Sequence, residues 1–398
     1  MPPVVHIVGA ARTDFARNWK KEGVGLREAV AEVALAAVAD AGLAPADIEA
    51  GFVGSFAPGL FTKQLHLGAL LADAHPAWVG LPAMHVEAAC ASGSMAAVAA
   101  VDRLLAGRAG CALVVGVEQQ KTMPPKEVGD VMAAAGDFAA ERPAYGELPI
   151  PKMFGRIAET YLKLAGAPAE VLAKVAVKAR AAAQLNPLAQ TRGKTLDLSA
   201  ACRVSDGNPL VADPLKVSDC SQITDGAAAV VLATDDFLQR RPVPRRVRIL
   251  GLGQATDRLR LADKNVPAFE ASVKAVRSAY ATAGLEPSQI GGFEVHDCFS
   301  ITEILAYEIL GLAERGEGWK LADRGRTGVG GEYPVNVGGG LMGDGHPVGA
   351  TGVRQLHECF EHLTGRAGDR QIPGVRTMAT WNMGGTFTTT VCFVLGAE

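Results

Sequence analysis

Two parts of the chain repeat the same order of apolar and polar positions. Alanine-rich amphipathic stretches at Leu26–Ala41 and Phe269–Ala283 predict helices, and each precedes a short apolar run that predicts a strand. A helix is also predicted at Ala96–Leu105, and the β-branched run Thr388–Leu395 predicts a strand. Each half therefore has a strand, a helix, a strand, a loop and a glycine-rich entry into a helix. Such alternation predicts an α/β fold with mainly parallel sheets covered by helices.

The two parts also repeat short motifs in register. Residues 41–48 (AGLAPADI) recur as residues 283–290 (AGLEPSQI), and the offset from Gly42 to Gly284 equals the offset from Gly9 to Gly251. A third match relates residues 106–109 to residues 364–367. Sequences rich in alanine and glycine resemble one another by composition, but three matches in the same order favour a duplication.

The duplication leads to a prediction of the domains. We predict that residues 1–120 and 217–243 form an N-terminal half, and residues 244–398 a C-terminal half. The unlike segment 121–216 is predicted to be an inserted loop domain. Its basic side chains suit either a phosphorylated ligand or a solvated helix face, and they are Lys174, Lys178, Arg180, Arg192, Lys194, Arg203 and Lys216.

Composition narrows the classes of function. The 398 residues are 48% hydrophobic and 20% charged, with a formal net charge of -3, which gives no electrostatic footprint for nucleic acid or an anionic membrane. We find no apolar run long enough to span a bilayer and no signal sequence at the start of the chain. Seven cysteines without a CxxC pair indicate reduced thiols. We therefore expect a cytoplasmic protein.

Cys90 is the first candidate for chemistry. It lies in a turn of small residues, Glu87–Met95, between a predicted strand and the helix that follows. Free N–H groups and the helix dipole at such a place lower the pKa of a thiol and favour the nucleophilic thiolate. The alternative is a packed and unreactive thiol, which is the commoner fate of a buried cysteine.

Three further segments place reactive side chains at predicted strand ends or in loops. His346 stands in the second half roughly where Cys90 stands in the first, so a pseudo-twofold axis would pair base with nucleophile. His296 and Cys298, two residues apart on a strand end, would share one face. The segments are residues 293–300 with His296 and Cys298, residues 338–352 with His346, and residues 380–386.

Zinc is the alternative explanation for His and Cys at short spacing. No second pair has the spacing of a zinc finger, and His357, Cys359 and His362 lie along one predicted helix without glycine turns. We therefore predict that the protein holds no metal.

Taken together, these motifs resemble those of the thiolases, specifically the sterol-carrier-protein type. The matching motifs are Cys-Ala-Ser-Gly from Cys90, His-Asp-Cys-Phe from His296 and the glycine-rich motif around His346. The resemblance runs from end to end. It implies two βαβα halves in an αβαβα layered fold, with the inserted domain forming the CoA and acyl pocket. It also implies a homodimer or homotetramer and a possible small OB-fold zinc protein as partner.

The resemblance also implies a reaction. Thiolases cleave or form 3-oxoacyl-CoA reversibly, with CoA as a substrate and no cofactor. Cys90 would be the nucleophile and His346 its base, while His296 and His346 would stabilise the enolate oxygen. The N–H groups of Cys90 and Gly384 would form a second oxyanion hole. Most thiolases carry a second cysteine where this chain has Asn382-Met-Gly384, so Cys298 would be the acid and base here.

Three rival functions are left by the sequence. Some relatives are retro-aldol lyases acting on β-hydroxy acyl-CoA, and these need no nucleophilic cysteine. A thiolase-like subunit could instead bind CoA esters without catalysis. A decarboxylating condensing enzyme would use the same Cys–His pair but no second thiol, so Cys298 counts against it.

Overall fold

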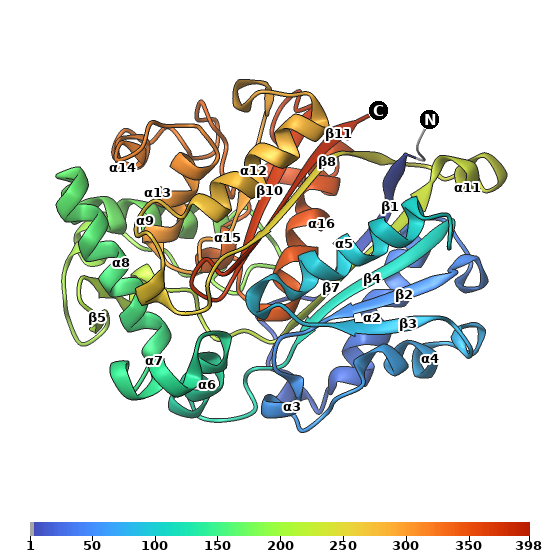
Figure 1. Ribbon diagram of the computed structural model, residues 1–398, viewed down its shortest axis with the longest axis horizontal. Helices are drawn as coiled ribbons and strands as arrows, with labels where there is room; N and C mark the ends of the chain where they lie inside the picture. The colour runs from blue at the N-terminus through green and yellow to red at the C-terminus, as the bar shows by residue number, and fades with distance from the viewer. Residues whose placement is uncertain (1–3) are drawn as a thin grey trace.

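The computed structural model describes residues 4–398, and in these residues nine strands form one sheet (Figure 1). The strand order is β3-β2-β4-β7-β1-β8-β11-β10-β9. The strands are β1 (Val5–Arg12), β2 (Ala50–Gly54), β3 (Ala83–Val86), β4 (Cys111–Glu118), β7 (Gly226–Thr234), β8 (Val247–Thr256), β9 (Phe293–Val295), β10 (Thr377–Gly384) and β11 (Thr389–Ala397).

The sheet consists of two half-sheets with mirrored order, which meet where β1 pairs with β8. That junction is short, with His6 opposite Arg248 and Ile7 opposite Val247. In the N-terminal half β2 is parallel to β3 and β4, while β7 is antiparallel to β4 and β1. In the C-terminal half β9 is parallel to β10, while β11 is antiparallel to β10 and β8.

The prediction of mainly parallel sheets is therefore wrong, because the sheet is mixed. In each half a returning strand, β7 or β11, lies between two strands of the same direction and makes both pairings antiparallel. The halves also differ at their outer edges. The N-terminal half ends in the edge strand β3. At the matching edge of the C-terminal half, β9 is followed only by a single β-bridge between Phe293 and Val335.

Two glycines show that the repeated motifs serve the same packing in both halves. A Cβ on Gly9 in β1 would overlap Ala37 and Ala41 of the neighbouring helix. A Cβ on Gly251 in β8 would overlap Ala279 and Ala283, the residues at the same offsets in the second half. Helix and strand approach closely at both places, which only glycine permits. The duplication predicted from the sequence is thus present in three dimensions.

The helices form layers around the sheet. Helix α2 (Leu26–Asp40) packs on the outer face of β1, β4 and β7, and α12 (Glu270–Ala283) packs on β8 and β11. Between the half-sheets lie α5 (Ser92–Leu105) and α16 (Thr351–Leu363), side by side in the centre of Figure 1. This arrangement confirms the layered α/β fold with two related halves.

The segment between β4 and β7 is an addition to the duplicated pattern. The equivalent strands β10 and β11 are joined by the short turn 385–388, whereas residues 119–225 separate β4 from β7. Helices of this segment gather at one end of the molecule in Figure 1. The domain boundaries at residues 120, 216 and 243 remain a prediction. The added elements are α6 (Pro125–Met132), α7 (Phe138–Tyr145), α8 (Pro149–Ala165), α9 (Glu170–Ala183), α10 (Leu198–Cys202), β5 (Leu210–Ala212) and β6 (Leu215–Lys216).

Part of the basic charge of residues 121–216 is neutralised by carboxylates from later in the chain. Lys174 pairs with Asp323 at 2.8 Å, and Lys178 and Lys216 pair with buried carboxylates. No helix within residues 4–398 is long and apolar enough to cross a membrane. The remaining helices are α1 (Trp19–Glu22), α3 (Pro58–Phe61), α4 (Leu70–Ala74), α11 (Asp235–Arg240), α13 (Ser300–Ile309), α14 (Gly318–Asp323) and α15 (Gly340–Gly343).

Candidate active site

Cys90 lies between strand and helix, as the sequence predicts. β3 ends at Val86, the residues Ala89–Ala91 form a 3-10 turn, and α5 begins at Ser92 and includes the apolar run from Ala96. Ala89 has a φ of 51°, which is unusual for a residue with a side chain. The Ser92 hydroxyl stabilises the turn, because its Oγ donates to the Ala89 carbonyl at 2.6 Å.

The same arrangement recurs before α16. Residues Val348–Ala350 form a 3-10 turn directly before this helix, so Gly349 is the structural counterpart of Cys90. His346 lies three residues earlier, in the loop, which refines the predicted equivalence. A Cβ on Gly93 would lie 2.6 Å from the Gly349 carbonyl oxygen, so the two helix starts touch. The predicted convergence of two helix N-termini is therefore confirmed.

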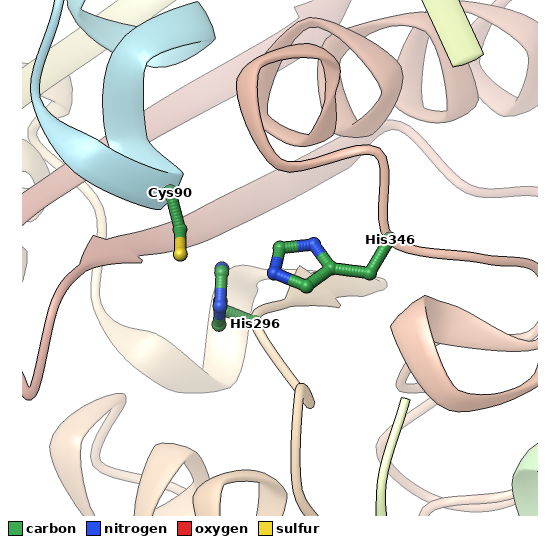
Figure 2. Close-up of side chains that lie close together, drawn as sticks. All are labelled: Cys90, His296 and His346. Carbon is green, nitrogen blue, oxygen red and sulfur yellow. The ribbon is translucent and has the colours of Figure 1, made fainter. Parts of the chain in front are cut away.

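This convergence brings Cys90, His296 and His346 together (Figure 2). The cysteine sulfur and a ring nitrogen of each histidine lie within 4.8 Å of one another. The imidazole rings are 5.0 Å apart between centroids and nearly perpendicular, at 89°. All three side chains are buried. Residues from β3–α5, β9–α13 and α15–α16 thus form one reactive cluster.

Hydrogen bonds define the proton positions on His346. Its Nδ1 lies 2.7 Å from the Thr351 Oγ1, and that hydroxyl also donates to the Pro347 carbonyl, which can only accept. With the hydroxyl proton directed to Pro347, we assign the imidazole proton to Nδ1, which then donates to Thr351. The Nε2 atom of His346 has no partner within residues 4–398, so a lone pair faces the cluster. His346 is in the tautomer that can accept a proton from Cys90.

His296 has the opposite tautomer. Its Nδ1 lies 2.9 Å from the Asn382 side-chain nitrogen, and the Asn382 oxygen accepts from the Ser94 hydroxyl. Since the amide nitrogen can only donate, the proton of His296 is on Nε2. This Nε2–H has no partner in the described part of the chain. The site therefore presents one acceptor and one donor beside the sulfur.

Burial sets the charge of all three groups. It raises the pKa of the Cys90 thiol to about 12, against opposing hydrogen bonds from the N–H groups of Gly385 and Cys90. It lowers the pKa of His346 to about 3 and that of His296 well below its usual value, with Arg354 contributing to both. The expected lowered pKa of Cys90 is thus wrong, because a helix start cannot compensate for complete burial.

The turn after β10 also faces Cys90. The N–H that bonds to the Cys90 sulfur belongs to Gly385, one residue beyond the predicted Gly384. Gly384 packs tightly, because a Cβ there would overlap the Ala88 carbonyl. Lys264 holds this turn through its Nζ, which donates to the Thr388 Oγ1 at 2.7 Å. The role of Gly384 as an oxyanion donor remains a prediction.

Cys298 lies near the cluster but is not one of the three residues in mutual contact. β9 ends at Val295, so His296 and Cys298 lie in the loop beyond it, and the argument from a shared strand face is wrong. Cys298 is buried, and the charge of Cys90 is among the causes that raise its pKa. The two thiols are thus close enough to interact electrostatically.

The sequence did not reveal Glu118, which links the loop after β2 to the turn before α16. Its carboxylate accepts the N–H groups of Phe56 at 2.7 Å and Gly349 at 3.0 Å, as well as the Ser55 hydroxyl. Burial raises the pKa of Glu118 to about 7. The available signal was a charged residue at the end of the otherwise apolar strand β4. Asn382, Thr351 and Ser94 were also missed as partners of the histidines.

A metal ion fits this cluster poorly. A thiol and two imidazoles within 4.8 Å have suitable ligand types for zinc. However, His296 presents Nε2–H rather than a lone pair, because Asn382 donates to its Nδ1. A metal would require the Asn382 amide and the His296 tautomer to reverse together.

Comparison with known proteins identifies the family. The thiolase N-terminal domain model matches residues 5–194, and the model described as thiolase C-terminal domain-like matches residues 253–397. The acetyl-CoA acetyltransferase of Methanothermobacter thermautotrophicus is 36% identical over 383 residues, 96% of either chain. The chain belongs to the thiolase family. It is accordingly a thiolase-family enzyme, as the motifs predicted.

Further relatives of this thiolase agree with the sterol-carrier resemblance. Human sterol carrier protein 2 is 30% identical over 397 residues, which cover 96% of this chain and 70% of that protein. The solved Ltp2-ChsH2(DUF35) aldolase has a TM-score of 0.82 at 23% identity, covering 100% of this chain and 99% of that one. Human mitochondrial 3-ketoacyl-CoA thiolase in complex with CoA has a TM-score of 0.75 at 16% identity, covering 100% and 98%. These structures confirm the thiolase fold.

Proposed function

We propose that this thiolase is an acyl-CoA C-acyltransferase that catalyses reversible thiolytic cleavage and Claisen condensation of 3-oxoacyl-CoA. The proposal depends most on one observation: the Cys90 sulfur, a free lone pair on His346 and a free N–H on His296 share one buried space. A relative that is 36% identical along nearly the whole chain is named acetyl-CoA acetyltransferase, which agrees with this chemistry.

In the first step Cys90 attacks the 3-oxo carbonyl carbon while His346 Nε2 takes the thiol proton. Both groups are neutral before substrate arrives, so proton transfer accompanies attack. The tetrahedral oxyanion would accept hydrogen bonds from backbone N–H groups of the Cys90 turn and of the turn that contains Gly384 and Gly385. Removing one such donor raises a barrier by about 3–4 kcal/mol in enzymes of this kind.

In the second step the bond between C2 and C3 breaks and acetyl-CoA leaves as its enolate. Cys298 protonates the carbon, and the His296 Nε2–H stabilises the enolate oxygen. His346 Nε2 also becomes a donor once it holds the Cys90 proton. Free CoA then attacks the acyl-Cys90 thioester while the Cys298 thiolate takes the CoA thiol proton. Cys90 leaves as the carbon–sulfur bond breaks and recovers its proton from His346, so that acyl-CoA is released and both cysteines are again thiols. In synthesis the same groups act in reverse.

An aldolase-type reaction is the main rival, since the solved aldolase shares the fold. Retro-aldol cleavage of a β-hydroxy acyl-CoA forms no acyl-enzyme, so it gives no reason for a cysteine with an adjacent base. Because the name of that aldolase includes a DUF35 protein, we propose a partner of this kind for the present chain too. We also propose that the chain forms a homodimer or homotetramer. A non-catalytic role in binding CoA esters would not explain why His346 presents a lone pair, and His296 an N–H group, beside the Cys90 sulfur.

The experiment is thiolysis of acetoacetyl-CoA with free CoA, measured for the wild type and Cys90→Ala, with and without a candidate DUF35 partner. We expect two acetyl-CoA per acetoacetyl-CoA in the wild type and none above background in the variant. A β-hydroxy acyl-CoA is the parallel substrate. Cleavage of that substrate alone, unaffected by Cys90→Ala, would establish the lyase instead. Turnover of neither substrate under all conditions would leave the binding role.

A further inference from the structure

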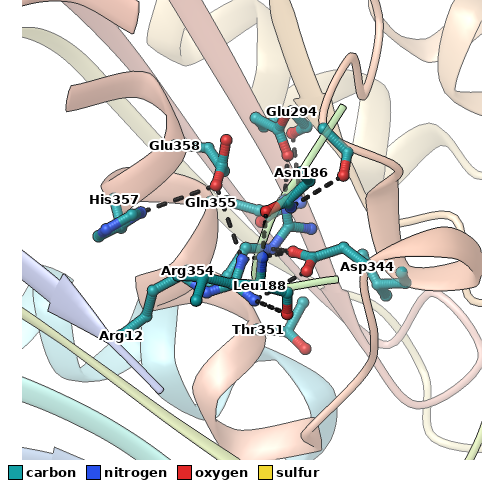
Figure 3. Close-up of polar contacts among 12 residues, drawn as sticks. Arg12, Asn186, Leu188, Glu294, Asp344, Thr351, Arg354, Gln355, His357 and Glu358 are labelled. Carbon is teal, nitrogen blue, oxygen red and sulfur yellow. Dashed lines mark hydrogen bonds and ion pairs between the residues drawn. The ribbon is translucent and has the colours of Figure 1, made fainter. Parts of the chain in front are cut away.

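A buried arginine connects the two histidine segments to one helix. Arg354 lies in α16 and is 1% exposed. Its guanidinium donates to the Glu294 carboxylate, and its Nε lies 3.8 Å from an oxygen of Asp344 (Figure 3). Glu294 and Asp344 are themselves buried, and they come from β9 and from the end of α15, which are far apart in the sequence.

The two carboxylates occupy matching positions. Glu294 stands two residues before His296, and Asp344 stands two residues before His346. One guanidinium therefore bonds the carboxylate ahead of His296 and lies within ion-pair distance of the carboxylate ahead of His346, which Arg12 holds by hydrogen bonds. The same helix supplies Thr351, which orients the His346 ring at 2.7 Å.

The neighbouring residue strengthens the connection. Gln355 donates through its side-chain nitrogen to the carbonyl oxygens of Glu294 and Trp381, each at 3.2 Å. Trp381 directly precedes Asn382, the hydrogen-bond partner of His296. The first turns of α16 thus contact every segment that carries a histidine or its orienting group.

We propose that Arg354 is a positioning residue, whose planar guanidinium fixes the segments of His296 and His346 relative to each other at Cys90; this inference rests on the proposed function. Arginine suits the task because its fork can engage two carboxylates at once, whereas a lysine ammonium is a point charge. Arg354 touches neither substrate nor the reacting atoms.

The charge of Arg354 has a second effect. It is among the causes that lower the pKa of both His296 and His346, and both must be neutral for the roles above. The other charged groups near it pair with one another, since Arg12 donates to Asp344 at 2.7 Å and Arg370 donates to Glu358 at 2.9 Å. The groups of either sign that face Arg354 or its partners are Arg12, Arg370, Glu294, Asp297, Asp344, Glu358 and His357.

The test uses Arg354→Lys and the paired variant Glu294→Gln/Arg354→Gln. The paired variant removes both charges of the ion pair, so neither charge is left buried without its partner. Arg370→Lys is the matched control, because Arg370 is a buried arginine of the same network that bonds Glu358 instead. Thiolysis of acetoacetyl-CoA is measured from pH 4 to 9. Alkylation of Cys90 by iodoacetamide is measured by mass spectrometry, since it reports on the Cys90–His346 pair without substrate.

For Arg354→Lys we expect kcat and the alkylation rate to fall about 100-fold, the effect of misplacing a reacting group by about 1 Å, with KM and the melting temperature close to those of Arg370→Lys. In the paired variant the pKa of His346 should rise above about 3, because the Arg354 charge is removed while burial, the larger cause, remains. His346 is a base only when neutral, so the acid limb of the activity profile should lie at higher pH than in the wild type.

Wild-type kcat and alkylation in Arg354→Lys would overturn the inference, as would equal losses in Arg370→Lys. An unchanged acid limb in a folded paired variant would overturn the electrostatic part, and if that variant does not fold, Arg354→Lys decides alone. If the wild type has no thiolysis activity, the proposed function fails. The alkylation rates then still decide whether Arg354 positions the pair.

Discussion

Replacing Thr351 by valine tests the tautomer of His346 most sharply. The substitution keeps the side-chain shape and removes the hydroxyl that accepts from Nδ1–H at 2.7 Å. Thr351 is buried, so no water replaces the lost partner. The tautomer with the proton on Nδ1 would then carry an unsatisfied donor, and the alternative tautomer has no lone pair on Nε2 to accept the Cys90 proton.

The size of the effect follows from the cost of that donor. Leaving a buried donor without a partner costs about 1–3 kcal/mol, and about 1.4 kcal/mol corresponds to a factor of ten in rate. We therefore expect the acylation rate of Thr351→Val to fall about 5- to 150-fold by these same constants. The assay is the rate of acetyl transfer from acetyl-CoA to Cys90 under single-turnover conditions.

Thr351→Ser is the control, because it retains the hydroxyl and loses only a methyl group. It should acylate within about threefold of the wild type, a difference worth less than 1 kcal/mol. Equal rates in Thr351→Val and Thr351→Ser would refute the assignment of Nδ1–H, and with it the view that Thr351 prepares His346 as a base.

Three other predictions concern groups at the same site. Cys298→Ala should still be acylated by acetyl-CoA but should not exchange the α-protons of acetyl-CoA with deuterated water; full exchange would show that another group is the acid and base. Because burial raises the pKa of Cys90 to about 12, its alkylation by iodoacetamide should keep rising with pH through 10, and a plateau below pH 9 would contradict a buried neutral thiol. Glu118 has a pKa raised to about 7 from 4.5, so the folded state holds its proton more tightly and loses stability as the pH rises through that interval. Glu118→Gln should reduce this loss between pH 5 and 7 in urea titrations, and an unchanged slope would place the shift elsewhere.

Much of the fold was predictable because it depends on local and repeated patterns. Gly9 and Gly251 recur at one offset since each permits a helix to approach a strand, and this requirement is visible in the sequence. The mixed sheet was not predictable in this way. Strand direction depends on where β7 and β11 insert. A continuous apolar run is typical of parallel strands, but here antiparallel β7 has one too, because it is buried on both faces.

The site divides in the same manner. Cys90 and His346 were found because small-residue or glycine-rich turns surround them, and His296 because it stands two residues from Cys298 at a predicted strand end. Their protonation was not found, because burial of Cys90 depends on segments that are distant in sequence. Glu118 and Arg354 escaped notice for a related reason: each bonds a partner more than 50 residues away, and a buried charge looks like a surface charge in a sequence.

The central claim is that Cys90 carries the acyl group, and the most direct measurement is peptide mass spectrometry after brief incubation with acetyl-CoA and acid quenching. We predict one acetyl group on the peptide that contains Cys90 and none on any peptide of Cys90→Ala. An acetyl group on another residue, or substrate turnover by Cys90→Ala at the wild-type rate, would contradict the account.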